Sequence, residues 1–334
     1  MSSSLVDLVS FVDPNTNNSQ VLRLAVRELA SYSNTDTCYD IVKIGALPKL
    51  CRLLSLDDPI VVHSAYNILV NLSAEEDLLS HIISEGIITR IMERIMNDKS
   101  YPFLQIALML LSNLSLSEDG CDALMASNGS FIIKLIVEMS RPFDEGNDKA
   151  AFVAPILGNV SRLKSFKELV TLKQPSLFSH ILDQLSSCSI RRRGGAACAV
   201  RNILFDESLH LTLLTDANDT LWKSLERVIV NDPVKEDGHI LLMVIESLFL
   251  LCSSEKGMEL LRGFNLGKLI EGLIEQLQPI KDQNEDFSSC INTCNSILNR
   301  LDDFDVQDVE VINKDAIPQV EELDDKMQDL FELD

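Results

Sequence analysis

The chain has 334 residues, of which 46% are hydrophobic, and a formal net charge of −22. A charge this negative argues against bulk binding of nucleic acid or of an anionic membrane, because both require a basic surface. Aromatic residues make up only 5% of a chain rich in leucine, isoleucine and serine, a composition that favours helices over a β-sandwich or β-barrel.

The N-terminus and the cysteines indicate the compartment. The start, MSSSLVDLVS, lacks the basic and the long apolar segments of a signal peptide. The longest apolar run, residues 240–252, is interrupted by Glu246 and is too short to span a bilayer. The eight cysteines fall mostly within apolar helical patterns and form no C-x-x-C pair, which is typical of free buried thiols. We therefore expect a cytoplasmic protein.

A triplet, N-L-S or N-V-S, recurs along the chain. Its asparagines are Asn71, Asn113 and Asn159, and Asn202 continues the series without the serine, at spacings of 42, 46 and 43 residues. A period of about 42 residues is typical of armadillo or HEAT repeats.

The serines of the triplet suggest how each repeat joins the next. Ser73 with Glu76, and Ser115 with Glu118, match the S-x-x-E capping box. The triplet is therefore predicted to close one helix and to open the next.

A second marker is a glycine before each amphipathic apolar run. Gly45, Gly86 and Gly129 are 41 and 43 residues apart, and Pro48 follows the first of them. Glycine accommodates the left-handed backbone at a helix end, and proline fits the first turn of the next helix. Residues 263–268 superficially resemble a phosphate-binding loop, but they lack its hydroxyl residue and are interpreted as another glycine break.

We predict an all-α, armadillo/HEAT-like right-handed superhelical solenoid of about six repeats over residues 1–301. Stacking supplies one continuous core, because no single repeat can bury its apolar face. Residues 302–334 carry thirteen acidic and two basic residues, a net charge of −11, and are predicted to form an acidic, disordered tail. The predicted units cover residues 1–44, 45–85, 86–128, 129–173, 174–215 and 216–264, followed by a capping helix pair at 265–301.

No catalytic motif is recognisable. The sequence has no G-x-S-x-G elbow, H-E-x-x-H helix or dinucleotide-binding glycine fingerprint. Its five histidines are scattered over three of the predicted units without the spacing of metal ligands. We therefore expect a protein with no enzymatic activity, cofactor or metal.

One helix, IRRRGGAACAVRNILF at residues 190–205, indicates a binding surface. Each of its paired glycines lowers the stability of the helix by about 1 kcal/mol relative to alanine. Close approach by another backbone would offset this loss. Residues 161–201 contain eight basic and two acidic residues, a local charge of +6 that would steer acidic partners. The predicted partner-binding residues are Arg191, Arg192, Arg193, Gly194, Gly195, Arg201, Asn202, Asn159, Arg162, Asn113 and Asn71.

Three alternatives stay open for this surface. Asn71 and Asn113 could serve only to satisfy carbonyl groups at helix ends. The two glycines could serve only close packing between helices. The arginines could bind the chain's own acidic tail rather than a partner.

APILGNVSR (residues 154–162) and SIRRRGGAACAVRNILFD (residues 189–206) resemble an armadillo-type chaperone family dedicated to translation elongation factor 2, the HGH-type proteins. The family's R-R-G-G-x-x-x-x-x-R-N helix corresponds here to Arg192, Arg193, Gly194, Gly195, Arg201 and Asn202. Specific motifs cover only residues 150–210. The family's aromatic-rich insertion after this helix is reduced here, and its tryptophan-containing penultimate helix is replaced by residues 266–278, which have no aromatic.

The resemblance implies a cytosolic adaptor that binds nascent elongation factor 2. It also implies cooperation with the eukaryotic chaperonin and the ninety-kilodalton heat-shock chaperone. A competing hypothesis is an armadillo nucleotide-exchange factor of the seventy-kilodalton heat-shock chaperone. A nuclear-import-type receptor fits less well, because such receptors line an acidic groove with tryptophans and this chain has only Trp222.

Overall fold

The computed structural model describes residues 3–15, 18–34, 37–98, 100–144, 146–230 and 237–303. These residues form helices joined by turns, without a strand among them, which confirms the all-α prediction. The chain divides into two compact units, of which the first comprises Met1–Phe166 and the second begins at Lys167. The predicted acidic tail lies outside the described residues beyond Asp303.

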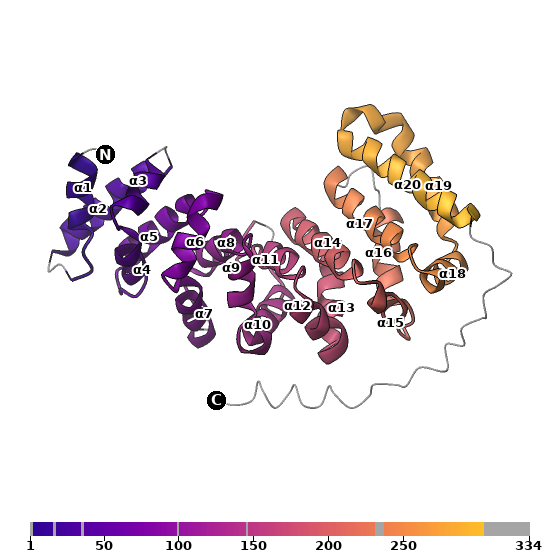
Figure 1. The fold of residues 1–334 in the computed structure, drawn as a ribbon, viewed down its shortest axis with the longest axis horizontal. Coiled ribbons are helices and arrows are strands. Elements are labelled where there is room, and N and C mark those ends of the chain that lie inside the picture. Colours follow the sequence, from indigo (N-terminus) through magenta and orange to yellow (C-terminus); the bar gives the residue numbers. More distant parts are fainter. Residues whose placement is uncertain are drawn as a thin grey trace. The chain divides into compact units, whose positions relative to one another are not determined.

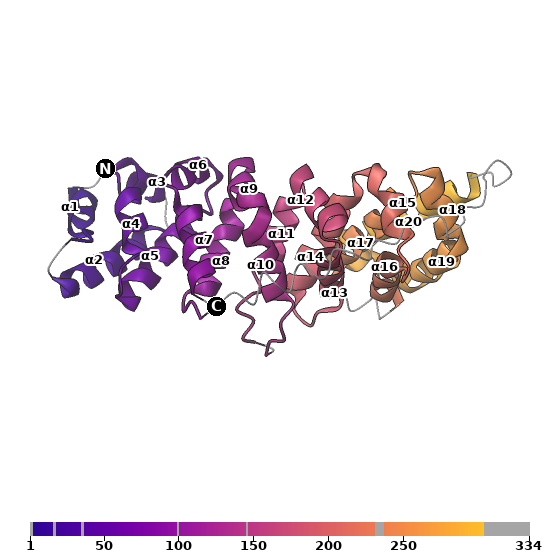
Figure 2. The same cartoon turned by 90° about the horizontal axis from the view of Figure 1, so that it is seen from below.

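Unit 1 contains two N-terminal helices and then three-helix repeats, each with a short first helix (Figure 1). The long third helices pack in succession, α2 against α5, α5 against α8 and α8 against α11. Figure 2 shows the short helices α3, α6 and α9 along one edge of this unit. The elements are α1 Ser3–Phe11, α2 Ser19–Tyr32, α3 Cys38–Lys43, α4 Leu47–Leu53, α5 Pro59–Leu72, α6 Glu76–Ser84, α7 Ile87–Asn97, α8 Leu104–Leu114, α9 Glu118–Leu124, η1 Ser127–Gly129, α10 Ser130–Met139 and α11 Val153–Val160.

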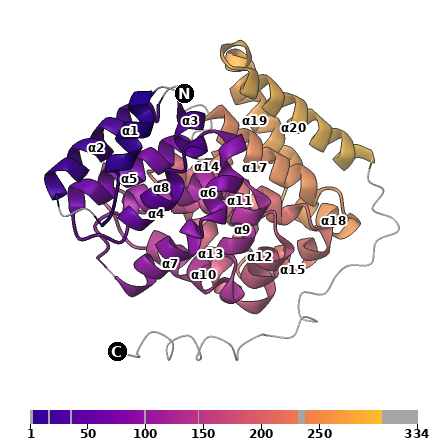
Figure 3. The ribbon, with the colours of Figure 1, turned by 60° about the vertical axis from the view of Figure 1, so that its left-hand side comes forward.

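Unit 2 continues the same pattern after α12, Lys164–Glu168, and a π-helical turn, η2 Leu169–Lys173. Its third helices α14, α17 and α20 again pack in succession, and α19 lies alongside α20 (Figure 3). The elements are α13 Ser176–Asp183, η3 Gln184–Ser186, α14 Ile190–Leu204, η4 Glu207–Leu209, α15 His210–Leu214, α16 Thr220–Val230, α17 Gly238–Leu251, α18 Glu255–Gly263, α19 Leu266–Leu277, η5 Gln278–Gln283 and α20 Glu285–Asp303. The described chain thus contains six three-helix repeats.

Left-handed residues separate the first and second helices of the repeats. Gly45, Gly86 and Gly129 have φ values of 76°, 69° and 75°, as the glycine marker predicts. The predicted break at residues 263–268 is carried instead by Asn265, with a φ of 59°, and Asp219, with a φ of 52°, precedes α16 in the same way. Asparagine and aspartate tolerate this conformation better than other non-glycine residues, so the break does not require glycine.

The predicted capping boxes at Ser73 and Ser115 are wrong. Both serines end a third helix, and their hydroxyls donate backward to the carbonyl oxygens of Val70 (2.8 Å) and Ser112 (2.7 Å). The last carbonyl groups of a helix have no partner within the helix, so a hydroxyl placed there is used by the helix that ends.

Two of the short first helices begin with a serine cap and a glycine. Ser117 Oγ accepts from the N–H of Gly120, and Ser254 Oγ accepts from that of Gly257, each at 3.1 Å. A Cβ atom at Gly120 would collide with the carbonyl oxygen of Leu114, and one at Gly257 would collide in the same way with the end of α17. Glycine therefore lets each short helix start directly against the end of the preceding third helix.

Six of the eight cysteines are buried, and all eight thiols are free. Burial raises the pKa of Cys51, Cys252, Cys290 and Cys294 to about 12. Cys188 is the exposed one. The buried thiols behave as small apolar core residues, as their sequence context predicts.

Candidate functional site

In unit 1, an asparagine near the end of each third helix donates a hydrogen bond to a serine one repeat earlier. These asparagine–serine bonds join Asn71 Nδ2 to Ser33 Oγ (2.8 Å), Asn113 Nδ2 to Ser73 Oγ (2.9 Å) and Asn159 Nδ2 to Ser115 Oγ (2.8 Å). We call this series the asparagine–serine ladder. It connects consecutive third helices, so Asn71 and Asn113 have a structural role, in which only Asn113 also donates to a carbonyl oxygen at a helix end, that of Val70.

The same asparagines have a second polar atom. Their side chains are half-buried, and Oδ1 of Asn71, Asn113 and Asn159 has no hydrogen bond with any residue that the structure describes. An amide oxygen can accept a backbone N–H of an extended peptide. The ladder therefore leaves the oxygen atoms for a partner, while Nδ2 of Asn113 and of Asn159 already donates to two acceptors.

Arg162 also joins neighbouring repeats. This exposed residue donates from Nε to the carbonyl oxygen of Asn159 (3.0 Å) and from Nη2 to those of Ser115 (3.3 Å) and Leu116 (3.2 Å). A cation at the carboxyl end of a helix is stabilised by the helix dipole. The carbonyl groups at the end of α8 therefore accept two of the hydrogen bonds that this guanidinium group donates.

The three consecutive arginines of α14 do not form one cluster in unit 2. Arg192 is 2% exposed and donates from Nη1 to Gln184 Oε1 at 3.2 Å, so its guanidinium group lies inside the unit. Gly195, one turn later, is buried on the same side. Successive helical residues point about 100° apart, so a run of arginines distributes its charges over different faces. We therefore leave Arg192 and Gly195 out of the candidate surface.

Arg191 and Arg193 lie nearer to solvent. Arg191 is exposed, and Arg193 is half-buried with Nη1 donating to the carbonyl oxygens of Ser187 (2.8 Å) and Cys188 (3.4 Å). These bonds fix the direction of the Arg193 side chain at the amino-terminal end of α14.

Gly194 faces the next third helix. A Cβ atom there would lie 3.7 Å from the side chain of Ile240 on α17, an ordinary van der Waals distance. Packing between α14 and α17 therefore does not require a glycine at this position. The use of Gly194 for close approach by a partner stays a prediction.

Arg201 forms an ion pair that the sequence analysis missed. Its Nη1 lies 2.8 Å from Oε2 of Glu246 on α17, and both side chains are partly exposed. Glu246 is the single charge in the apolar run at 240–252, and it follows Arg201 by 45 residues, about one repeat. This spacing places residues side by side on consecutive third helices and could have identified the pair. Asn202, beside Arg201, is 9% exposed.

A second contact between third helices also involves an arginine and joins α17 to α20. The guanidinium carbon of Arg300 lies 3.8 Å from the centre of the Phe249 ring, and Nη1 donates to the Phe249 carbonyl oxygen at 3.3 Å. Cations over an aromatic face are attracted by its quadrupole. We call the solvent-accessible residues on the third helices of unit 2 the α14–α20 surface: Arg191, Arg193, Gly194, Arg201, Glu246 and Arg300.

The α14–α20 surface has four cations and one carboxylate, a set suited to binding an acidic or carbonyl-rich polypeptide. Among the described residues, no group of three or more histidine, cysteine or acidic side chains is placed to hold a metal ion. No single helix among the described residues has the length and hydropathy to cross a bilayer. Two bent helix pairs, α9 with α10 and α17 with α18, reach that length and hydropathy together.

Comparisons with known proteins agree on one family. Residues 94–244 match the model of a family described as a domain of unknown function, DUF383. The chain is 25% identical over 316 residues to the HGH1 homolog of Dictyostelium discoideum, covering 84% of this chain and 88% of that protein. It is 26% identical over 260 residues to the HGH1 homolog of Danio rerio, covering 70% and 69%.

Solved structures similar to this one are armadillo repeat proteins and an engineered protein. A designed armadillo repeat protein in complex with the peptide (KR)4 gives a TM-score of 0.60 at 16% identity, covering 74% of this chain and 99% of that one. The engineered protein gives 0.69 at 15% identity, covering 90% and 72%. These likenesses establish the armadillo fold.

Proposed function

Because the chain belongs to the HGH1 family of armadillo-like repeat proteins, we propose that it is a non-enzymatic chaperone adaptor of the cytoplasm. Its client is nascent elongation factor 2, which it holds while the cytosolic chaperonin folds it. The ninety-kilodalton heat-shock chaperone is a further partner. The client and both chaperones come from the resemblance to the HGH-type family, while the fold supports a protein-binding repeat protein.

The observation that carries this proposal is the set of solvent-accessible arginines on α14, together with Arg300 on α20. Arg201 is oriented by its 2.8 Å ion pair with Glu246, and Arg193 by the carbonyl group of Ser187. Side chains that are already ordered lose less conformational freedom when a partner binds. The α14–α20 surface is thus suited to grip carboxylates of a client segment and to shield that segment from wrong contacts.

The orphaned atom of Arg201 fits this role. Its Nε is buried and has no hydrogen-bond partner among the described residues. A carboxylate that binds a guanidinium group side-on contacts Nε and one Nη together. A client carboxylate could complete the hydrogen bonding of Arg201 only if the side chain turned to expose Nε, while Glu246 retained Nη1.

The test is a tagged pulldown from cells of the source organism, read by mass spectrometry. The native protein is compared with Arg193→Glu/Arg201→Glu and with a matched control, Arg227→Glu/Lys268→Glu. The control pair is exposed on second helices of the same unit and changes the net charge equally. Circular dichroism verifies that each variant is folded.

Recovery of elongation factor 2 and chaperonin subunits with the native and control proteins, but not with the surface variant, supports the proposal. Equal recovery with all three places client binding elsewhere. Enrichment of the seventy-kilodalton heat-shock chaperone without elongation factor 2 supports the exchange factor instead, and release of a fluorescent nucleotide would then be accelerated.

A further inference from the structure

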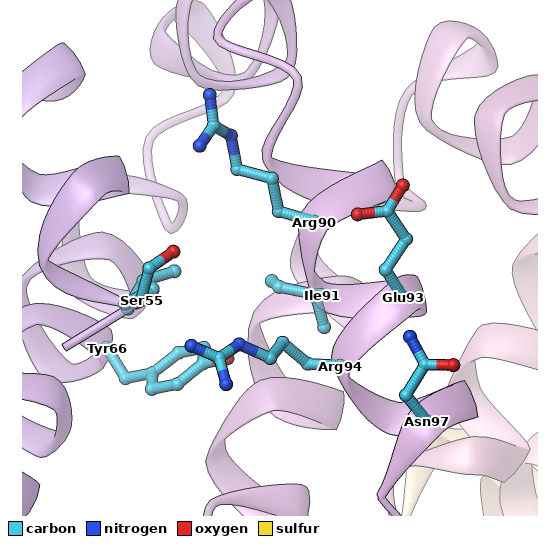
Figure 4. Close-up of a pocket in the computed structure, with 8 residues that line it drawn as sticks. Ser55, Tyr66, Arg90, Ile91, Glu93, Arg94 and Asn97 are labelled. Atoms are coloured by element: carbon cyan, nitrogen blue, oxygen red, sulfur yellow. The ribbon is translucent and has the colours of Figure 1, made fainter. Parts of the chain in front are cut away.

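A pocket of about 300 Å³ lies within unit 1, remote in sequence from the α14–α20 surface. It opens between the end of α4, at Ser55, and the second helix α7, and Tyr66 of α5 and Ile91 of α7 contribute to its lining (Figure 4). Ile91 and Tyr66 are buried, so the pocket has an apolar floor.

Two arginines give this pocket its charge. Arg90 and Arg94 extend from α7 on the side of Ser55, whereas Glu93 extends from the other side of the helix (Figure 4). Both arginines are exposed, and neither guanidinium group forms a hydrogen bond or an ion pair with any residue that the structure describes. Two guanidinium groups at one pocket, without an ion-pair partner among the described residues, are unexpected in a chain with a net charge of −22.

The neighbouring phenols do not neutralise these arginines. The hydroxyl of Tyr66 is hydrogen-bonded to that of Tyr101 at 2.8 Å, and burial raises the pKa of both groups. Both phenols therefore stay neutral at physiological pH. Neither phenol can therefore serve as a counterion for Arg90 or Arg94, and both guanidinium groups are accessible to an anionic ligand.

The spacing of the arginines along α7 is compatible with an extended ligand. The Cα atoms of residues four apart on a helix are about 6 Å apart along its axis, and long arginine side chains can place their guanidinium groups at that distance or farther apart. Side chains two apart on an extended peptide are about 6.6 Å apart and point to the same face. Figure 4 shows the two guanidinium groups at opposite edges of the pocket, so they fit two separate anionic groups better than one small anion.

We propose that the Arg90–Arg94 pocket binds an extended acidic segment of a partner polypeptide. Two carboxylates separated by one residue pair with Arg90 and Arg94, and the segment runs over Ile91 with Ser55 opposite. This site is separate from the proposed client surface of unit 2, so the two can be tested independently.

The test measures binding of a fluorescent acetyl-Gly-Glu-Ser-Glu-Gly-amide peptide to the full chain by anisotropy. We expect the Arg90→Gln/Arg94→Gln variant to bind at least about tenfold more weakly, because each lost charge pair is largely solvent-exposed but the two act together. The matched control, Arg27→Gln/Arg227→Gln, removes two exposed arginines that form no ion pair with a described residue, and it should bind as the native chain does. Binding should also weaken as the salt concentration rises.

Peptides and competitors test the details. A peptide with glutamine in place of glutamate should not bind, and one with three residues between its glutamates should bind more weakly. Equal affinity of the double variant and the control would overturn the site. Displacement by micromolar inorganic phosphate would make it a small-anion site instead. Tighter peptide binding after neutralisation of the acidic residues at 321–325 would identify the chain's own acidic stretch as the occupant.

Discussion

Asn113 donates through Nδ2 to Ser73 of the preceding repeat, while its Oδ1 has no hydrogen bond among the described residues. The two polar atoms of one amide thus have different roles, since the nitrogen connects two repeats and the oxygen is left for a partner. A substitution at this position would change both stability and binding, so the two effects must be measured separately.

For Asn113→Ala we expect a loss of about 1–2 kcal/mol in the free energy of unfolding, because bonds to Ser73 and to the Val70 carbonyl oxygen disappear. Urea denaturation measures the change. Asn292→Ala, at an exposed position on α20, should stay within about 0.5 kcal/mol of the native chain. Equal effects of the two substitutions would mean that the ladder does not hold the repeats.

Two glycines should respond oppositely to alanine. Gly194→Ala should stabilise the chain by up to about 1 kcal/mol, because its methyl group meets only an ordinary contact with Ile240 and helix propensity improves. Gly120→Ala should destabilise it by more than about 2 kcal/mol, because the methyl group collides with the backbone of Leu114. Thermal unfolding separates the two. If Gly194→Ala weakens client binding while raising stability, the glycine serves close approach by the client.

The raised pKa values of the buried thiols predict that the protein loses stability at alkaline pH. Cys51, Cys252, Cys290 and Cys294 have a pKa of about 12 in the fold against 9.0 for the free thiol. Between these values the unfolded chain binds fewer protons than the folded chain, so the free energy of unfolding is fully present below pH 9 and falls as the pH rises.

Urea unfolding at about pH 8 and pH 10.5 measures this slope. Cys294→Ala should make the slope shallower, whereas Cys188→Ala, at an exposed thiol, should leave it unchanged. A slope that is the same in both variants would contradict the assignment.

At the scale of the helix, α14 shows what periodicity determines and what it does not. The repeat period and the glycine marker predict where helices begin, because those signals are local to the chain. Arg192 belongs to the buried side, which helical geometry could have identified, whereas a run of three arginines by itself predicts a single charge cluster. The contact between Glu246 and Arg201 could have been predicted only by applying the repeat period to charged residues, and not just to the N-L-S motif.

The capping prediction failed for a different reason. An S-x-x-E match describes the helix that follows the serine, but Ser73 is already used by the helix that precedes it. Similarly, Asn265 and not a glycine carries the last left-handed turn, since several residue types tolerate that conformation. Such choices depend on contacts between helices, which a single sequence does not display.

The ion pair between α14 and α17 gives a prediction for these two helices. Arg201→Glu alone should destabilise unit 2 by about 1 kcal/mol, because two carboxylates then face each other across a half-exposed contact. Arg201→Glu/Glu246→Arg should recover most of that stability. Client binding should stay impaired in the exchanged pair, because the cation is then on the neighbouring helix. Recovered binding would show that only the charge balance of the surface matters.

At the scale of the molecule, repeats contact mainly their neighbours, so damage should stay local. Gly120→Ala in unit 1 and Gly257→Ala in unit 2 introduce the same backbone collision at corresponding places. Hydrogen exchange read by mass spectrometry should show lost protection in the repeats around each substitution, with the other unit close to native. A uniform loss of protection across the whole chain would show instead that the described helices unfold as one cooperative body.

The asparagine–serine ladder has a consequence for how such a chain can change length. Residues 74–115 contain both halves of the connection, since Asn113 reaches back to Ser73 and Ser115 receives Asn159. If this segment were duplicated in tandem, the copied asparagine would find Ser115 and the copied serine would receive Asn159. Gene duplication of one repeat could therefore extend the array without a compensating change at either junction, so the reach of the protein can evolve in whole repeats.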